Sequence, residues 1–198
     1  MAAQIYLLTP PNAEPTRFPA LLQTVLAANP VSALLVRRHD LSPAAYETLV
    51  KALLPIAQSS ACALLVEDDS ALAISLGADG VHVGPDIKTA KAAIAAAKPA
   101  LIVGVGPCDS RHDAMILGEL NIDYLLFGPL EQNGKANGAE LAQWWAQTFE
   151  IPAVLSAPDA GADLVDALGA EFLALSQSLW QREDPAAFLT TFFSQQEA

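Results

Sequence analysis

The strongest constraint on the fold of this chain is the alternation of short apolar runs with longer segments of helical period. Each run holds four or five residues rich in Val, Ile and Leu and is bounded by turn or cap residues. Such runs are too short for buried helices, so we expect strands that are covered on both faces. The expected strands span residues 5–9, 33–37, 63–67, 80–84, 101–105, 124–128, 153–156 and 172–176.

This alternation indicates a parallel sheet, because parallel neighbours need a crossover connection, usually a helix. An open doubly wound sheet would fit the alternation as well. Three stretches at 77–84, 121–128 and 169–176, however, share one pattern of helix end, apolar run and final Gly or Ser. Nearly even spacing of similar units is typical of a periodic architecture. The sequence therefore predicts a (β/α)8 TIM barrel, eight-stranded and parallel, as a single domain over residues 1–198, with function at the carboxyl ends of the strands.

Helix boundaries are readable at several places. Ser42 followed by Pro43 predicts a helix start, since serine caps the free backbone donors and proline fits the first helical position. Asp184 followed by Pro185 predicts another start. Gly77 and Gly169 fall where helices are expected to end, because glycine adopts a positive φ without steric cost.

Composition narrows the class of function. With 53% hydrophobic and 16% charged residues the chain is not disordered. Its net charge of −12 argues against nucleic acid or an anionic membrane as partner, because phosphate neutralisation needs clustered Lys and Arg.

No run reaches the ~18 to 20 apolar residues of a membrane span, and the start lacks the basic region of a signal peptide. Cys62 and Cys108 are too few for a disulfide framework, so we expect a reducing, cytoplasmic location.

Acidic residues follow two neighbouring strands. Asp68 comes after the third expected strand and Asp86 after the fourth. Carboxylates at adjacent strand ends can share a hard cation such as Mg²⁺, which prefers oxygen ligands. Both residues also precede expected helices, so an ordinary capping role explains them equally well.

Basic and imidazole side chains also lie near strand ends. Arg37 and Arg38 could bind phosphate by a forked pair of donors, although alternation along the strand points only one of them inward. His39 and His82 are candidate proton carriers. A lone histidine in an apolar strand such as that of His82 is more often a hydrogen-bonded core residue.

Taken in order, these segments resemble the thiamine phosphate synthase / TenI family of (β/α)8 barrels over nearly the whole chain. The Gly-Ala-Asp-Gly-Val-His-Val-Gly stretch and the Phe-Gly-Pro element are fairly specific when they occur together. The resemblance is carried by residues 6–9, 36–42, 65–69, 76–84, 102–105, 123–129 and 151–154.

The resemblance implies a reaction that joins hydroxymethylpyrimidine diphosphate to thiazole phosphate, with Mg²⁺ and basic groups stabilising the leaving pyrophosphate. In the TenI branch a histidine instead moves a proton during thiazole tautomerisation. The resemblance assigns Asp68 to the metal. The family's second metal aspartate is Ile87 here, and Asp86, one position earlier, is the candidate in its place. His82 and His39 are the candidates for catalysis. The resemblance assigns substrate binding to Arg37, Gly128, Lys135 and Ser176.

Several anion-binding positions of the family are changed here. The family's glutamine before the arginine is Leu35, its lysine is His39, and the arginine after the metal aspartate is Asp69. The Gly-Gly that donates N–H groups to a phosphate is Ala157-Pro158, and proline has no N–H. Each lost charge-assisted hydrogen bond is worth ~1.5 to 3 kcal/mol. The alternative is therefore a TenI-like or catalytically degenerate barrel that binds a less anionic small molecule or a partner, and a homo-oligomer is also possible.

Overall fold

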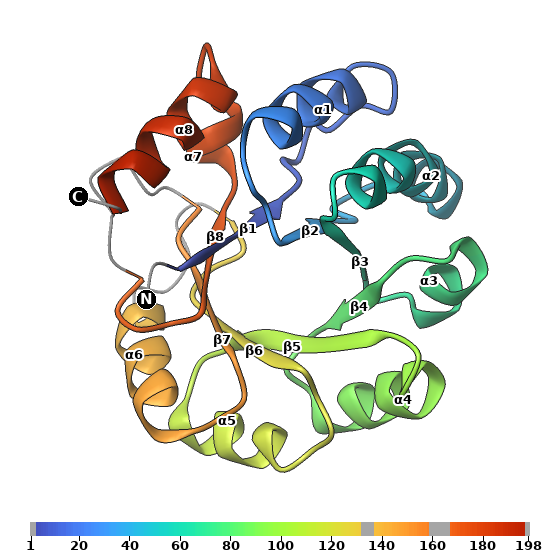
Figure 1. Ribbon diagram of the computed structural model, residues 1–198. Coiled ribbons are helices and arrows are strands. Elements are labelled where there is room, and N and C mark those ends of the chain that lie inside the picture. Colours follow the sequence, from blue (N-terminus) through green and yellow to red (C-terminus); the bar gives the residue numbers. More distant parts are fainter. Residues whose placement is uncertain (1–2, 132–136, 159–166, 197–198) are drawn as a thin grey trace.

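The eight expected strands form one closed parallel barrel (Figure 1). The computed structural model describes residues 3–131, 137–158 and 167–196. Within these residues each strand pairs with the next one in the sequence, and the last strand pairs with the first, for example through Ile5 opposite Leu173. This closure confirms the predicted (β/α)8 barrel and excludes the open doubly wound sheet.

The strands and helices alternate along most of the chain, and Figure 1 shows the helices as an outer ring around the strands. The strands are β1 (Gln4–Leu8), β2 (Ala33–Val36), β3 (Ala63–Glu67), β4 (Gly80–Val83), β5 (Ile102–Cys108), β6 (Tyr124–Phe127), β7 (Ala153–Ser156) and β8 (Phe172–Leu175). The helices are α1 (Phe18–Ala28), α2 (Pro43–Ser59), α3 (Ser70–Leu76), α4 (Ile87–Ala97), α5 (Arg111–Gly118), α6 (Gly138–Thr148), α7 (Gln177–Trp180) and α8 (Pro185–Gln196).

The helix boundaries follow the signals in the sequence. The Ser42 hydroxyl accepts a hydrogen bond from the Ala45 N–H at the start of α2. Gly77 ends α3 with a φ of 73°, in the left-handed region where glycine is favoured. The Asp184 carboxylate accepts a hydrogen bond from the Ala187 N–H at the start of α8. The helix expected between β7 and β8 falls largely on residues 159–166, which lie outside the described part of the chain.

Strand β5 is longer than predicted. It continues through Gly106 and Pro107 to Cys108, with a shift of register against β6 between Val105 and Cys108. A Cβ on Gly106 would lie 2.6 Å from the Leu126 carbonyl oxygen, so the close approach of β5 to β6 requires glycine there. This extension of β5 was not predicted, because a Gly-Pro dipeptide usually marks a turn at the end of a strand.

Two apolar layers hold the barrel together. The larger layer lies between the strands and the surrounding helices. The smaller one fills the barrel interior and is formed by alternate, inward-pointing strand residues, namely Tyr6, Leu8, Ala33, Leu35, Leu65, Tyr124, Leu126, Val154 and Ala174. Because this interior is filled, a ligand can enter only at a rim of the barrel. In the described part of the chain, no helix has both the length and the apolar character to cross a membrane.

Candidate active site at the carboxyl ends of the strands

Polar side chains lie one step above the apolar interior, at the carboxyl ends of the strands. Successive side chains of a strand point to opposite faces, so a residue two positions after an interior residue also points inward. Arg37 follows Leu35 in this way, and Glu67 follows Leu65. Gly128, Ser156 and Ser176 stand in the same relation to Leu126, Val154 and Ala174. The period-2 pattern therefore gathers these residues at one mouth of the barrel.

Arg37 is the buried cation of this mouth. Its Nε donates to Glu67 Oε1 at 2.6 Å, and its Nη1 donates to the Leu130 carbonyl oxygen at 3.0 Å. Its Nη2 lies 3.5 Å from Glu131 Oε1. Arg38 is only half-buried, as expected if one of the two arginines points inward. The guanidinium thus links the end of β2 to β3 and to the loop after β6.

His39 lies beside Arg37 at the edge of the mouth. Its Nδ1 is 3.4 Å from Glu131 Oε1, and its Nε2 is buried without a hydrogen-bond partner among the described residues. The φ of His39 is 44° and that of Asp68 is 52°, so two non-glycine residues at strand ends adopt the left-handed region. Such conformations cost free energy and are concentrated at functional sites.

His82 lies deeper, within the barrel interior. Its Nδ1 is 2.8 Å from the Tyr124 hydroxyl, which in turn is 2.8 Å from the Tyr6 hydroxyl. Burial lowers the pKa of His82 from 6.5 to about 3, because water cannot solvate the charged form. Burial likewise raises the pKa of Tyr124 well above its usual value. His82 is therefore a neutral, hydrogen-bonded residue of the interior, which was the more frequent of the two alternatives for such a histidine.

Asp68 and Asp86 both contact Gly84, Asp68 through its carboxylate and Asp86 through its backbone N–H. The Asp68 carboxylate accepts a hydrogen bond from the Gly84 N–H at 3.2 Å, and the Asp86 N–H donates to the Gly84 carbonyl oxygen at 2.9 Å. Asp86 also caps α4, because its Oδ1 accepts from the Thr89 N–H and hydroxyl at 2.8 and 2.9 Å. These bonds to Thr89 lower the pKa of Asp86 below its ordinary value. Both carboxyl groups are exposed, hard oxygen donors, so this donor set fits a magnesium ion that keeps waters or phosphate oxygens. No group of three or more His, Cys, Asp or Glu side chains in the described ranges could hold a metal by itself.

The opposite side of the mouth is built from β6, β7 and β8. Gly128 has a φ of 88°, and a Cβ on it would lie 2.5 Å from the Ser156 carbonyl oxygen. The Ser156 hydroxyl donates to the Pro129 carbonyl oxygen at 2.6 Å, which fixes the turn after β6. Ser176 is buried at the start of α7, and its hydroxyl makes no capping bond to that helix. Lys135, the remaining substrate-binding residue expected from the sequence, lies outside the described residues.

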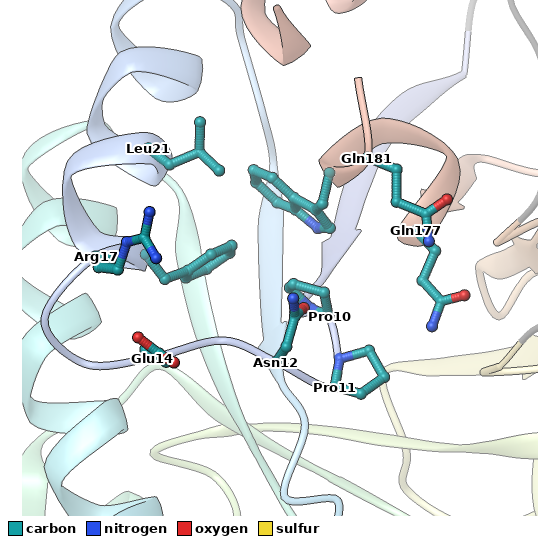
Figure 2. Close-up of a pocket in the computed structure, with 10 residues that line it drawn as sticks. Pro10, Pro11, Asn12, Glu14, Arg17, Leu21, Gln177 and Gln181 are labelled. Atoms are coloured by element: carbon teal, nitrogen blue, oxygen red, sulfur yellow. The ribbon is translucent and has the colours of Figure 1, made fainter. Parts of the chain in front are cut away.

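Two hollows lie on either side of Pro11, in the loop after β1. The smaller, about 390 Å³, is lined by Pro11, His39, Asp40, Leu41 and Glu131 and opens at the mouth. The larger, about 610 Å³, lies between α1 and α7 (Figure 2). Its walls are the loop at Pro10 and Pro11, Phe18 of α1, and Trp180 of α7. None of the predicted site residues lines this larger groove.

Sequence reasoning did not single out Glu67, Glu131, Tyr6 and Tyr124 as parts of this region. The inward period of their strands was the available signal for Glu67 and the two tyrosines. The register places Glu67 beside His82, and it places Tyr124 in the same row through Gly104. Glu131 gave no such signal, because it lies in a loop.

The fold and the mouth define a TIM barrel with an arginine and exposed carboxylates at one rim, suited to an anionic substrate and a hard cation. The family model described as thiamine monophosphate synthase matches residues 5–178. The chain therefore belongs to the thiamine monophosphate synthase family.

The relatives cover the chain almost completely. The thiamine-phosphate synthase of Rhodospirillum centenum is 33% identical over 96% of this chain and 95% of its own length. That of Hyphomonas neptunium is 34% identical over 96% of this chain and 91% of its own length. Among solved structures, thiamine phosphate pyrophosphorylase from Pyrococcus furiosus superposes with a TM-score of 0.83 at 20% identity, covering 98% of this chain and 95% of that one. The 3-hexulose-6-phosphate synthase from Salmonella typhimurium reaches a TM-score of 0.76 at 18% identity, covering 98% of each chain. Because the identities are only 20% and 18%, these structural matches show a shared fold and nothing further.

Proposed function

We propose that this protein is a thiamine phosphate synthase, which joins hydroxymethylpyrimidine diphosphate to thiazole phosphate and releases pyrophosphate. The observation that carries the proposal is the family match over residues 5–178, shared with relatives that are named thiamine-phosphate synthases. The gathering of Arg37, Asp68 and Ser176 at one end of the barrel supports it, because the reaction needs two anionic substrates side by side.

In this reaction the thiazole nitrogen forms a bond to the methylene carbon of the pyrimidine while the carbon–oxygen bond to the diphosphate breaks. The electron pair of that bond leaves with pyrophosphate, so no oxidant or reductant is needed. Catalysis then consists of stabilising the leaving anion and excluding water from the electron-poor carbon. The terminal nitrogens of Arg37 bond the Leu130 carbonyl oxygen and approach Glu131 in this structure, and in the complex they would donate to the diphosphate. The buried layer of His82, Tyr124 and Tyr6 would form a floor that water does not reach.

Magnesium is the cofactor that we propose for this site. Asp68, with Asp86 as the second carboxylate, would hold the ion together with oxygens of the diphosphate. The ion would supply positive charge that neutralises the leaving group. Asp68 suits this role better than Asp86, since the carboxylate of Asp86 is engaged by Thr89.

We assign Ser176 and the backbone at Gly128, which lie at the carboxyl ends of β8 and β6, to the thiazole phosphate. The family resemblance assigns Lys135 to the diphosphate. His39 is the histidine placed to carry a proton, since it lies at the smaller hollow beside Glu131. Because a histidine with a pKa of about 3 is a weak base, we do not propose proton transfer by His82 as the main activity. Free, buried Cys62 and Cys108 support our proposal of a reducing, cytoplasmic location.

The proposal is tested by incubating the purified chain with both substrates and Mg²⁺ and measuring thiamine phosphate and pyrophosphate by chromatography. We expect equal amounts of the two products, and none when either substrate or Mg²⁺ is omitted. Absence of thiamine phosphate at micromolar enzyme would contradict the proposed activity.

A further inference from the structure

The guanidinium of Arg37 is bonded to two carboxylates, of Glu67 and Glu131, and to the Leu130 carbonyl oxygen. Glu67 Oε1 accepts from Arg37 Nε at 2.6 Å, and the side chains of Arg37 and Glu67 are only 10% and 12% exposed. Glu131 Oε1 lies 3.5 Å from Nη2 of the same guanidinium. In the described residues, every charged group in contact with this guanidinium is therefore negative.

Glu67 cannot easily move aside when an anion arrives. Its second oxygen, Oε2, accepts from the Arg38 N–H at 2.6 Å, so both oxygens of the carboxylate are bonded. Removing either bond would leave a buried donor without a partner, which is unfavourable. Glu131 differs, because its side chain is 60% exposed and makes only long contacts at 3.4 and 3.5 Å. An incoming phosphate can displace Glu131, but Glu67 stays beside the arginine.

Among the described residues around Arg37, the charge that a ligand meets is therefore negative. Glu67 offsets the charge of Arg37, and Asp68, the next residue along the chain, adds another carboxylate to the same strand end. Like charges a few ångströms apart repel strongly where water is partly excluded. A free diphosphate is disfavoured under these conditions, whereas one that has bound a divalent cation brings the missing positive charge with it.

We infer that Glu67 is a specificity-determining residue, which makes this site reject the free diphosphate and accept the diphosphate only as its complex with a divalent cation. The inference rests on the proposed function, in that the diphosphate belongs to its substrate. It concerns a residue of this chain and can be measured by binding alone, without turnover.

In the experiment, the full chain is titrated with inorganic pyrophosphate and binding is measured by calorimetry. The titration is done once in excess Mg²⁺ and once in EDTA. The variant is Glu67→Gln, which removes the charge but keeps the size of the side chain. The matched control is Asp123→Asn. Asp123 also bridges a cation and a backbone donor, through Lys98 and the Val103 N–H, but it precedes β6 at the opposite end of the barrel.

For the wild-type chain we expect pyrophosphate to bind at least about tenfold more tightly with Mg²⁺ than in EDTA. Glu67→Gln should gain about tenfold in affinity for pyrophosphate in EDTA, and Asp123→Asn should leave it unchanged. An affinity in EDTA that stays the same or falls in Glu67→Gln overturns the inference, because Glu67 would then only position Arg37. The inference is also overturned if the wild-type chain binds pyrophosphate equally well in both buffers, or if it binds pyrophosphate in neither buffer.

A second variant covers the case in which Glu67→Gln does not fold, as judged by circular dichroism. Glu131→Gln removes the exposed carboxylate on Arg37 and should raise the affinity in EDTA about threefold; no gain overturns the inference. The two proposals fail separately. A chain that shows this binding pattern but makes no thiamine phosphate contradicts the proposed function alone. A chain that makes the product while Glu67→Gln gains nothing contradicts the inference alone.

Discussion

Gly104 provides the space through which Tyr124 reaches His82. In the sheet register His82 is paired with Gly104, and Gly104 with Tyr124, so the three residues form one row across β4, β5 and β6. A Cβ on Gly104 would lie 1.9 Å from Tyr124 Cζ. The missing side chain lets the Tyr124 ring lie across β5 and place its hydroxyl 2.8 Å from His82 Nδ1. One glycine thus permits the polar layer beneath the mouth.

This relationship predicts that Gly104→Ala is destabilising. The added methyl group would overlap a buried ring that has no space to move, which costs about 1 to 3 kcal/mol or more in a packed interior. Denaturant unfolding of the variant should show this loss. Gly84→Ala is the control, because a Cβ at Gly84 has no neighbour within 4 Å. Equal stability of the two variants would show that Tyr124 does not occupy the space above Gly104.

The buried His82 should make stability depend on pH. Its pKa is lowered from 6.5 to about 3 in the folded chain, so between these values the unfolded chain binds a proton that the folded chain does not. Stability is therefore lost as the pH falls below about 6.5, by roughly 2 kcal/mol between pH 7 and pH 5. Denaturant unfolding of wild type and His82→Gln over this range measures the effect. The difference between the two should shrink by that amount at pH 5; parallel pH profiles would contradict the burial of a neutral histidine.

Asp86 is expected to serve both the helix and the metal. Asp86→Ala should lower the free energy of unfolding by about 1 kcal/mol, because the cap of α4 is lost. Asp86→Ser keeps a capping oxygen and should retain the stability, while raising the Mg²⁺ concentration needed for half-maximal synthesis about fivefold. Asp68→Asn should reduce activity more than Asp86→Ser does, without a change in melting temperature. If Asp86→Ser has the wild-type requirement for Mg²⁺, Asp86 acts only as a cap.

Arg37→Lys should show that the forked guanidinium is needed. A lysine cannot bond Glu67 and the Leu130 carbonyl oxygen at once, so its charge would be kept while the geometry is lost. We expect the KM for the pyrimidine diphosphate to rise at least about tenfold. Steady-state kinetics with the diphosphate as the varied substrate measure this. Arg38→Lys is the control, and an equal change in both variants would mean that the inward position of Arg37 has no special role.

The barrel was predictable because each strand is a separate apolar run with its own turn residues, so the error at β5 did not affect its neighbours. The inward position of one arginine was predictable from alternation alone. Glu67 was open to the same reasoning, since it lies on the neighbouring strand and follows Leu65 as Arg37 follows Leu35. Glu131 was not, because it lies in a loop that is distant from Arg37 in the sequence. The capping role of Asp86 could not be separated from metal binding by sequence, since both need an exposed carboxylate before a helix.

The most direct test of the account is a crystal structure of the full chain with pyrophosphate and Mg²⁺. We expect the anion at the mouth of the barrel, in contact with the terminal nitrogens of Arg37, with the ion on Asp68 and with Glu67 still bonded to the arginine. Pyrophosphate bound instead in the groove between α1 and α7, or bound at the mouth without contact to Arg37 or Asp68, would contradict it.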